Sequence, residues 1–125
     1  MILDRDCVRN VLLSIESLES GQKITSDNIS NVSFLDPYSK EVIVYTIERL
    51  DEAGFINVKF LRTLGGEDPF LITSLTWDGH QFLDNIRDDG VWKETKKVTS
   101  KVASVSLGIL SDVAASVLKK TLVLE

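Results

Sequence analysis

Residues 38–76 read YSKEVIVYTIERLDEAGFI, NVKFLRTL, GGEDP and FLITSLT in direct succession. Ser39 is a favourable N-cap for a helix, and Gly54 supplies the left-handed residue at which helices commonly end. The predicted buried face of this helix carries Ile43, Thr46, Ile47, Leu50 and Ala53. Residues 56–60 then alternate as a strand, and residues 70–75 return as a second strand after a Gly-Gly turn. The stretch therefore predicts a helix that runs directly into a β-hairpin.

Further helices are expected on both sides of this stretch. Asp4 is a plausible N-cap of a first helix, whose apolar residues recur at helical spacing: Val8, Val11, Leu12, Ile15 and Leu18. A short second helix is expected over residues 25–35, with the apolar anchors Ile24, Ile29, Val32 and Leu35. Thr76 is expected to cap another helix that buries Phe82, Leu83 and Ile86, with Gly79 allowing a close approach at its start.

The character of the sequence changes after residues 88–90. A heptad-like seam follows at spacings of four and three, namely Val91, Thr95, Val98, Val102, Val105 and Ile109, and Leu110, Ala114, Val117 and Thr121 continue it. Gly108 is expected to bend or break this helix. The seam either packs on its own domain or pairs with a second copy in a homodimer; the candidate dimer residues are Val91, Val98, Val102, Val105, Ile109, Leu110 and Val117. We divide the chain into a domain, 1–89, and a helical extension, 90–125.

Composition describes an ordinary globular chain with an uneven charge. The N-terminus has charges where a signal peptide needs apolar residues, and the longest weakly polar run, 102–118, is too short to cross a bilayer. A single cysteine excludes an internal disulfide. We therefore expect a cytoplasmic protein without a membrane partner. Residues 1–90 carry a net charge of −8 and residues 91–125 a net charge of +3, so the main domain repels phosphate at long range.

The order helix, helix, helix, hairpin, helix resembles winged helix-turn-helix regulators. The segment LDEAGFI, 50–56, is similar to the exit from their recognition helix, and LTWDGH, 75–80, is similar to the entry into the helix after their wing. The resemblance implies an α+β fold of the winged helix-turn-helix type: three helices, a β-hairpin wing and a following helix, here with a C-terminal helical extension.

A second resemblance covers nearly the whole chain. The segments LDRDCVRNVLLSIE, 3–16, and LTWDGHQFLDNIRDDGVWKETK, 75–96, are similar to a family of uncharacterised proteins often encoded in phages and prophages, filed as a domain of unknown function. The resemblance implies a winged-helix-like fold and a phage or prophage origin. It brings no activity and no catalytic residues to this chain.

The exposed face of the helix after Ser39 has the wrong charge for reading DNA. Glu41, Tyr45, Glu48 and Glu52 share the face opposite the core, where a DNA reader needs cationic or amide side chains. Two interpretations of these glutamates are open: a solvated acidic face, or a contact surface for a basic protein partner. The apolar centre of such a contact surface would be Val42, Val44 and Tyr45. The candidate DNA contacts are Lys40, Arg49, Lys59, Arg62, Lys93, Lys96 and Lys97.

Catalytic and metal-binding patterns are weak in this sequence. Cys7 lies in the first turn of a helix, and His80, the single histidine, has no cysteine or histidine at metal-ligand spacing. We therefore expect no cofactor, no metal and no enzyme activity. The first hypothesis is a regulatory or interaction module that acts through protein contacts. The alternative is a DNA-binding transcriptional regulator that uses the third helix, the wing and the basic extension.

Overall fold

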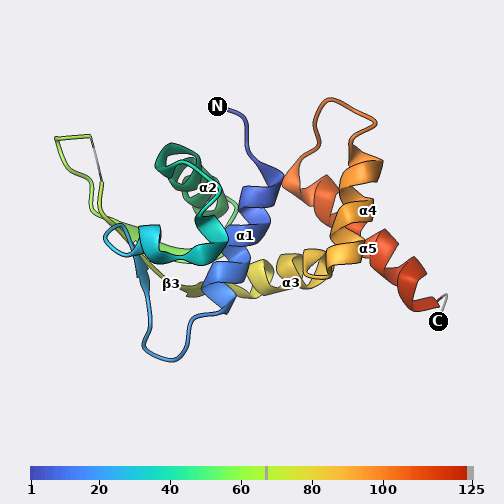
Figure 1. The fold of residues 1–125 in the computed structure, drawn as a ribbon, viewed down its shortest axis with the longest axis horizontal. Helices are drawn as coiled ribbons and strands as arrows, with labels where there is room; N and C mark the ends of the chain where they lie inside the picture. Colours follow the sequence, from blue (N-terminus) through green and yellow to red (C-terminus); the bar gives the residue numbers. More distant parts are fainter. Residues whose placement is uncertain (67, 124–125) are drawn as a thin grey trace. The chain divides into compact units, whose positions relative to one another are not determined.

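The computed structural model describes residues 1–66 and 68–123 and divides into two compact units, Met1–His80 and Gln81–Glu125. Within the described residues the fold is mixed α+β, with five α-helices and one three-stranded antiparallel sheet (Figure 1). In chain order the elements, with η for 3-10 turns, are α1 Arg5–Glu16, β1 Ile24–Thr25, η1 Ile29–Asn31, η2 Ser33–Leu35, α2 Lys40–Glu52, β2 Ile56–Phe60, β3 Phe70–Leu75, α3 Trp77–Ile86, α4 Asp89–Thr99 and α5 Leu107–Val123. The predicted α+β class is confirmed, and the predicted domain boundary after Asp89 stays a prediction.

Helix α1 forms the centre of the first unit, where it packs against α2, η2 and β3. Asp4 Oδ1 accepts a hydrogen bond from the Cys7 N–H at 2.9 Å, so the predicted N-cap is confirmed. The buried side chains of α1 are Cys7, Val8, Val11, Leu12, Ser14 and Ile15. Leu18 does not extend this face, because the helix ends at Glu16 and Leu18 is only half-buried beyond it.

Helix α2 begins and ends at the predicted residues. Ser39 Oγ accepts from the Val42 N–H at 3.2 Å, and Gly54 adopts a φ of +79° just after the helix. Its buried residues are Ile43, Thr46, Ile47 and Leu50. Ala53 was predicted on the same face but is exposed, because the helix has already reached its C-cap there.

The sheet has the strand order β1-β3-β2, so β3 lies between the other two strands. Phe60 faces Phe70 across the predicted hairpin, and Ile24 of β1 pairs with Ile72 on the other side of β3. A bulge in the register at Asn57 and Val58 shifts the buried positions of β3, which are Phe70, Ile72 and Leu75. The hairpin predicted from the sequence is confirmed.

The predicted second helix is wrong. Residues 25–35 instead contribute to β1 and form the two turns η1 and η2, separated by Val32 in an extended conformation. Thr25 Oγ1 accepts from the N–H groups of Asp27 and Asn28 at 3.2 Å, and Asn28 Oδ1 accepts from the Thr25 N–H at 2.8 Å. Such side-chain bonds give the backbone an alternative to the helix. The predicted anchors Ile24, Ile29 and Leu35 are still buried, and Val32 is half-buried.

The start of α3 is held to the end of α2 by one threonine. Thr76 Oγ1 accepts from the Gly79 N–H at 3.0 Å, as a cap does, and donates to the Gly54 carbonyl at 2.6 Å. The Thr76 N–H donates to the Phe55 carbonyl at 3.0 Å. A Cβ on Gly79 would collide with that same Phe55 carbonyl, so the predicted close approach is confirmed. The predicted residues Phe82, Leu83 and Ile86 are buried.

In the second unit α4 packs against α5. Asp88 Oδ2 caps α4 through the Val91 N–H, and the helix ends at Thr99. The predicted break in the helix is present but not at Gly108, since residues 100–106 form a loop and Gly108 lies inside α5. Ser106 Oγ then accepts from the Ile109 N–H at 3.1 Å at the start of the new helix. The buried seam residues are Val91, Thr95, Leu110 and Ala114, the half-buried ones are Val98, Val105 and Val117, and the exposed ones are Val102, Ile109 and Thr121.

Candidate functional site

The predicted contact face of α2 lies at the surface of the first unit. Glu41 and Glu52 are exposed, and Val42, Tyr45 and Glu48 are half-buried. Their spacing along one helix keeps these side chains near one another, as the sequence predicts. The face therefore presents three carboxylates beside a half-buried valine and a half-buried tyrosine.

Arg49 is engaged by its neighbours on this helix. Its Nε lies 3.0 Å from Glu52 Oε1, and its NH2 group lies 4.0 Å from Glu48 Oε2. The guanidinium also stands over the Tyr45 ring, 5.0 Å from the ring centroid. One cation thus compensates part of the charge of two glutamates, and the surface around Tyr45 stays acidic.

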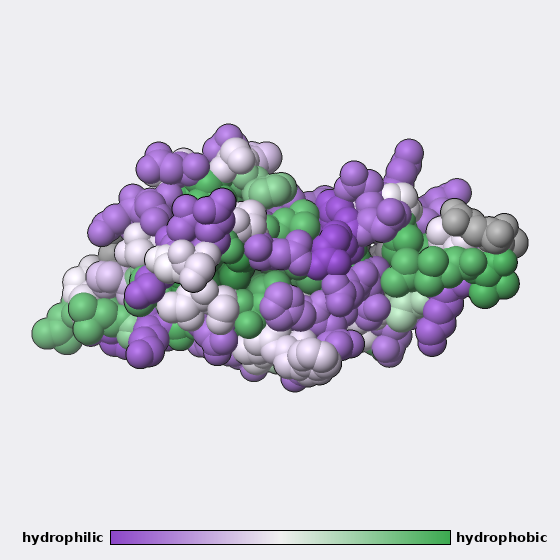
Figure 2. All heavy atoms as spheres, turned by 90° about the horizontal axis from the view of Figure 1, so that it is seen from below, coloured by the Kyte–Doolittle hydropathy of each residue, from purple (hydrophilic) through white to green (hydrophobic). Residues whose placement is uncertain are grey.

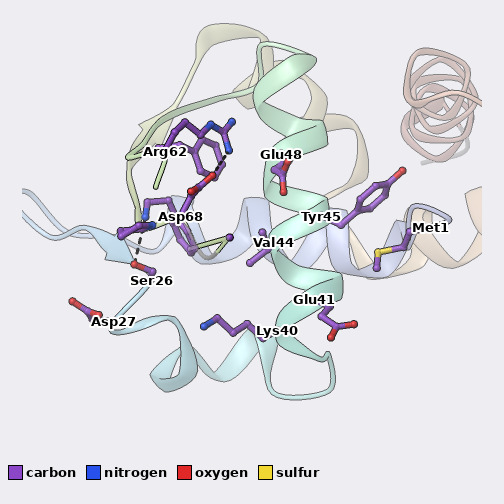
Figure 3. A pocket seen from close by; sticks show the side chains of 14 residues that line it. Met1, Ser26, Asp27, Lys40, Glu41, Val44, Tyr45, Glu48, Arg62 and Asp68 are labelled. Atoms are coloured by element: carbon purple, nitrogen blue, oxygen red, sulfur yellow. Dashed lines mark hydrogen bonds and ion pairs between the residues drawn. The ribbon is translucent and has the colours of Figure 1, made fainter. Parts of the chain in front are cut away.

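A groove of about 520 Å³ lies between α2 and the β2–β3 hairpin (Figure 3). Its lining residues are Met1, Ser26, Asp27, Lys40, Glu41, Val44, Tyr45, Glu48, Phe60, Arg62, Gly66, Asp68, Pro69 and Phe70. In the close-up Val44 lies on the side of α2 that faces the hairpin, and Arg62 and Asp68 lie on the opposite wall. The groove brings together five predicted residues, namely Lys40, Glu41, Tyr45, Glu48 and Arg62.

An ion pair closes the loop between β2 and β3 on the far wall of the groove. Asp68 accepts hydrogen bonds from the Thr63 N–H at 2.7 Å and from Arg62 NH1 at 2.9 Å. The Thr63 bond and then the Arg62 bond lower the pKa of the Asp68 carboxyl below its ordinary value of 3.8. The Arg62 guanidinium also lies over the Phe60 ring, 4.6 Å from its centroid.

Sequence reasoning missed the hairpin wall as part of a site. Phe60, Asp68 and Phe70 were assigned only to the strands and the turn, whereas Val44 was predicted in the apolar centre of the α2 contact surface. The sequence carries a signal for the α2 wall of the groove alone, since the spacing of Lys40, Val44 and Glu48 puts all three on one stripe of the helix. The structure places the hairpin opposite that stripe, because Phe60, Arg62 and Phe70 line the same groove as Lys40, Val44 and Glu48.

The predicted DNA contacts are divided between the two units. Lys40 and Arg62 line the groove, while Arg49 is paired on α2 and Lys59 is exposed on β2. Lys93, Lys96 and Lys97 belong to α4 in the second unit, where Lys96 Nζ stands 5.8 Å from the Trp92 ring centroid. Lys93 and Lys97 are exposed.

The two side chains considered for chemistry lie apart from the groove lining. Cys7 is fully buried in α1, and burial raises the pKa of its thiol above the ordinary value. His80 is exposed on α3. Across residues 1–66 and 68–123, no group of three or more histidines, cysteines and carboxylates is arranged to hold a metal ion. No helix within these ranges is long and apolar enough to span a membrane.

Comparison with known proteins places the chain in a family. Residues 2–106 match the family model described as hypothetical protein (DUF2513). The chain belongs to the DUF2513 family. An uncharacterized protein of Haemophilus influenzae is 30% identical to this chain over 119 residues, which cover 94% of this chain and 95% of that protein. No solved structure matches.

Proposed function

We propose that this DUF2513 protein is a non-enzymatic regulatory module of the winged-helix type that acts through protein contacts. The strand order β1-β3-β2 and the placement of α2 directly before the β2–β3 hairpin support the winged-helix arrangement. The segment between β1 and α2 departs from it, because two 3-10 turns replace a helix. The resemblance of residues 3–16 and 75–96 to phage-encoded proteins supports a phage or prophage origin.

The charge arrangement on α2 carries the proposal. In a winged-helix regulator this helix would face the phosphates of a DNA groove, which would be repelled by Glu41, Glu48 and Glu52. Arg49 cannot offset that repulsion fully, because it already lies 3.0 Å from Glu52. The half-buried Tyr45 instead offers the aromatic contact common at the centre of protein interfaces. A protein with a basic surface is the partner that this combination favours.

Site-specific photocrosslinking tests the proposal. The photoreactive residue p-benzoylphenylalanine replaces Tyr45 in the full chain, expressed in the cells from which the gene comes. We expect a crosslink to one or a few proteins, and we expect the double substitution Glu48→Lys with Glu52→Lys to remove it. The control places the same residue at Glu19, an exposed position in the loop after α1. Crosslinks that survive the charge reversal, or that join position 45 to DNA, would contradict the proposal.

DNA binding is the second candidate function, and exposed lysines favour it. Lys59 on β2 and Lys93 and Lys97 on α4 are exposed and could contact phosphates. Under this alternative, Lys59→Glu combined with Lys97→Glu should abolish binding to duplex DNA. Under the protein-contact proposal, the same double variant behaves as the wild type in the crosslinking experiment.

Self-association through the second unit is a further part of the proposal. Figure 2 shows hydrophobic side chains gathered on the surface around the C-terminal helix. Val102 is 56% exposed and Ile109 is 51% exposed, although both belong to the predicted seam. Light scattering should therefore report a homodimer for the wild type and a monomer for Val102→Glu combined with Ile109→Glu. A monomeric wild type would refute the dimer.

A further inference from the structure

The groove between α2 and the hairpin has an apolar floor. Phe70 is buried to 4% exposure, while Val44 and Phe60 are half-buried and keep part of their surface open. The Phe60 and Phe70 rings lie 6.0 Å apart at an interplanar angle of 55°, so they form a tilted aromatic pair. A volume of about 520 Å³ is in the range that accommodates a few side chains. The floor can therefore bury one apolar side chain of an incoming segment.

The rim of this groove is acidic. Among its lining side chains the carboxylates are Asp27, Glu41, Glu48 and Asp68, and the cations are Lys40 and Arg62. Arg62 pairs with Asp68 at 2.9 Å and covers part of Phe60, so both charges are compensated within the hairpin wall. Glu41 and Glu48 line the groove from α2, about one helical turn on either side of Val44. In Figure 3 the Glu41 side chain lies on the same side of α2 as Tyr45 and Met1. Cations on a ligand would find their partners on the α2 wall.

We propose that this groove binds a peptide segment of a partner protein in which one apolar side chain is flanked by lysine or arginine. The apolar side chain packs on Val44 and Phe60, and the flanking cations lie against Glu41 and Glu48. This assignment rests on the proposed protein-contact function and adds to it the chemistry of the bound segment. Charge complementarity selects a basic segment, because an acidic segment or a phosphate backbone meets the same carboxylates with the wrong sign.

Two matched peptide pools test the assignment on the full chain. Both are fluorescein-labelled ten-residue pools with Leu, Ile, Phe or Trp at the centre; one has Lys and Arg at the flanking positions, and the other has Asp and Glu. Fluorescence anisotropy should show binding of the basic pool only, weakened by added salt. Replacing the central residue of the basic pool with Gly should reduce the affinity by roughly tenfold. Equal binding of both pools, or of neither, would overturn the assignment.

Variants locate the bound peptide on α2. Glu48→Gln should weaken binding of the basic pool by roughly three- to fivefold, as expected for one half-exposed ion pair. Val44→Ala should weaken it by roughly fivefold through lost apolar contact. Glu19→Gln is the matched control, because Glu19 is exposed in the loop after α1 and lies outside the groove lining, and it should leave the affinity unchanged. Thermal melts followed by circular dichroism confirm that each variant is folded.

Amide chemical shifts distinguish failure of this assignment from failure of the proposed function. Binding in the groove should move the amide signals of Val44, Phe60 and Phe70. If the basic pool binds but shifts only signals near Glu52, and Glu52→Gln weakens binding, the groove assignment is wrong and a protein contact through α2 still stands. If neither pool binds and the crosslinking at Tyr45 captures DNA, both proposals are wrong.

Discussion

Replacing Gly79 with alanine should destabilise the first unit, because backbone atoms of Phe55 occupy the space that a Cβ needs. An ideal Cβ at Gly79 would lie 2.9 Å from the Phe55 carbonyl carbon and 3.3 Å from its Cα, and closer still to the carbonyl oxygen. Backbone cannot swing aside as the end of a flexible side chain can. The same carbonyl accepts a hydrogen bond from the Thr76 N–H at 3.0 Å, so moving it also weakens the junction between α2 and α3.

The magnitude follows from three opposing contributions. Overpacking costs about 1–3 kcal/mol, and one weakened hydrogen bond costs about 1 kcal/mol. Alanine recovers about 1 kcal/mol relative to glycine inside a helix. We therefore expect Gly79→Ala to lower the free energy of unfolding by about 1–3 kcal/mol. Gly108→Ala is the matched control, because Gly108 also lies near the start of a helix and its Cβ would meet only Ser106 Oγ at 3.9 Å.

Urea unfolding of the full chain, followed by circular dichroism, measures both variants. Gly108→Ala should be neutral or stabilising by up to about 1 kcal/mol, since the helical preference for alanine acts there without a collision. Equal midpoints for Gly79→Ala and Gly108→Ala would refute the close approach of α3 to Phe55. A Gly79→Ala variant more stable than the wild type would refute it more strongly.

Three further predictions follow from single side chains. Cys7 should resist thiol reagents at mildly alkaline pH in the native protein and react after unfolding, because burial raises its pKa. Ser39→Ala should cost about 1 kcal/mol in urea unfolding through loss of the α2 cap. The native pKa of Asp68 lies below 3.8, so its stabilisation of the hairpin is complete above pH 3.8 and is lost as the pH falls through the lowered value. The protection of the Thr63 amide from exchange, measured relative to its intrinsic rate, should fall in that acidic window, and Asp68→Asn should remove this dependence.

Local interactions explain how much of the fold was predictable. Ser39 and Gly54 bound α2 through contacts within a few residues, so its ends could be predicted from sequence alone. The segment 25–35 has helical apolar spacing, but the side chains of Thr25 and Asn28 satisfy the backbone in another way. Helical spacing likewise continues through residues 100–106, where the structure has a loop. The spacing of apolar residues does not indicate where one helix ends and a serine, here Ser106, caps the next.

The candidate site was only half predictable for a different reason. Glu41, Tyr45 and Glu48 share a helix face, and helical geometry alone places them together. Phe60 and Asp68 come from the hairpin, which strand pairing and the Arg62–Asp68 ion pair hold together, and both line the groove with Val44. These are contacts between separate segments, which the spacing of residues along one element does not encode.

A fluorescence-anisotropy titration of the full chain with mixed-sequence duplex DNA, at low and then at physiological salt, tests the central claim most directly. The account predicts no binding of DNA even at low salt, because the acidic face of α2 repels the phosphates. The basic peptide pool should bind under the same conditions. Binding that weakens steeply with added salt, and that is lost in Lys59→Glu with Lys97→Glu, would contradict it. The exposed lysines would then outweigh Glu41, Glu48 and Glu52, and the protein would be a DNA-binding regulator.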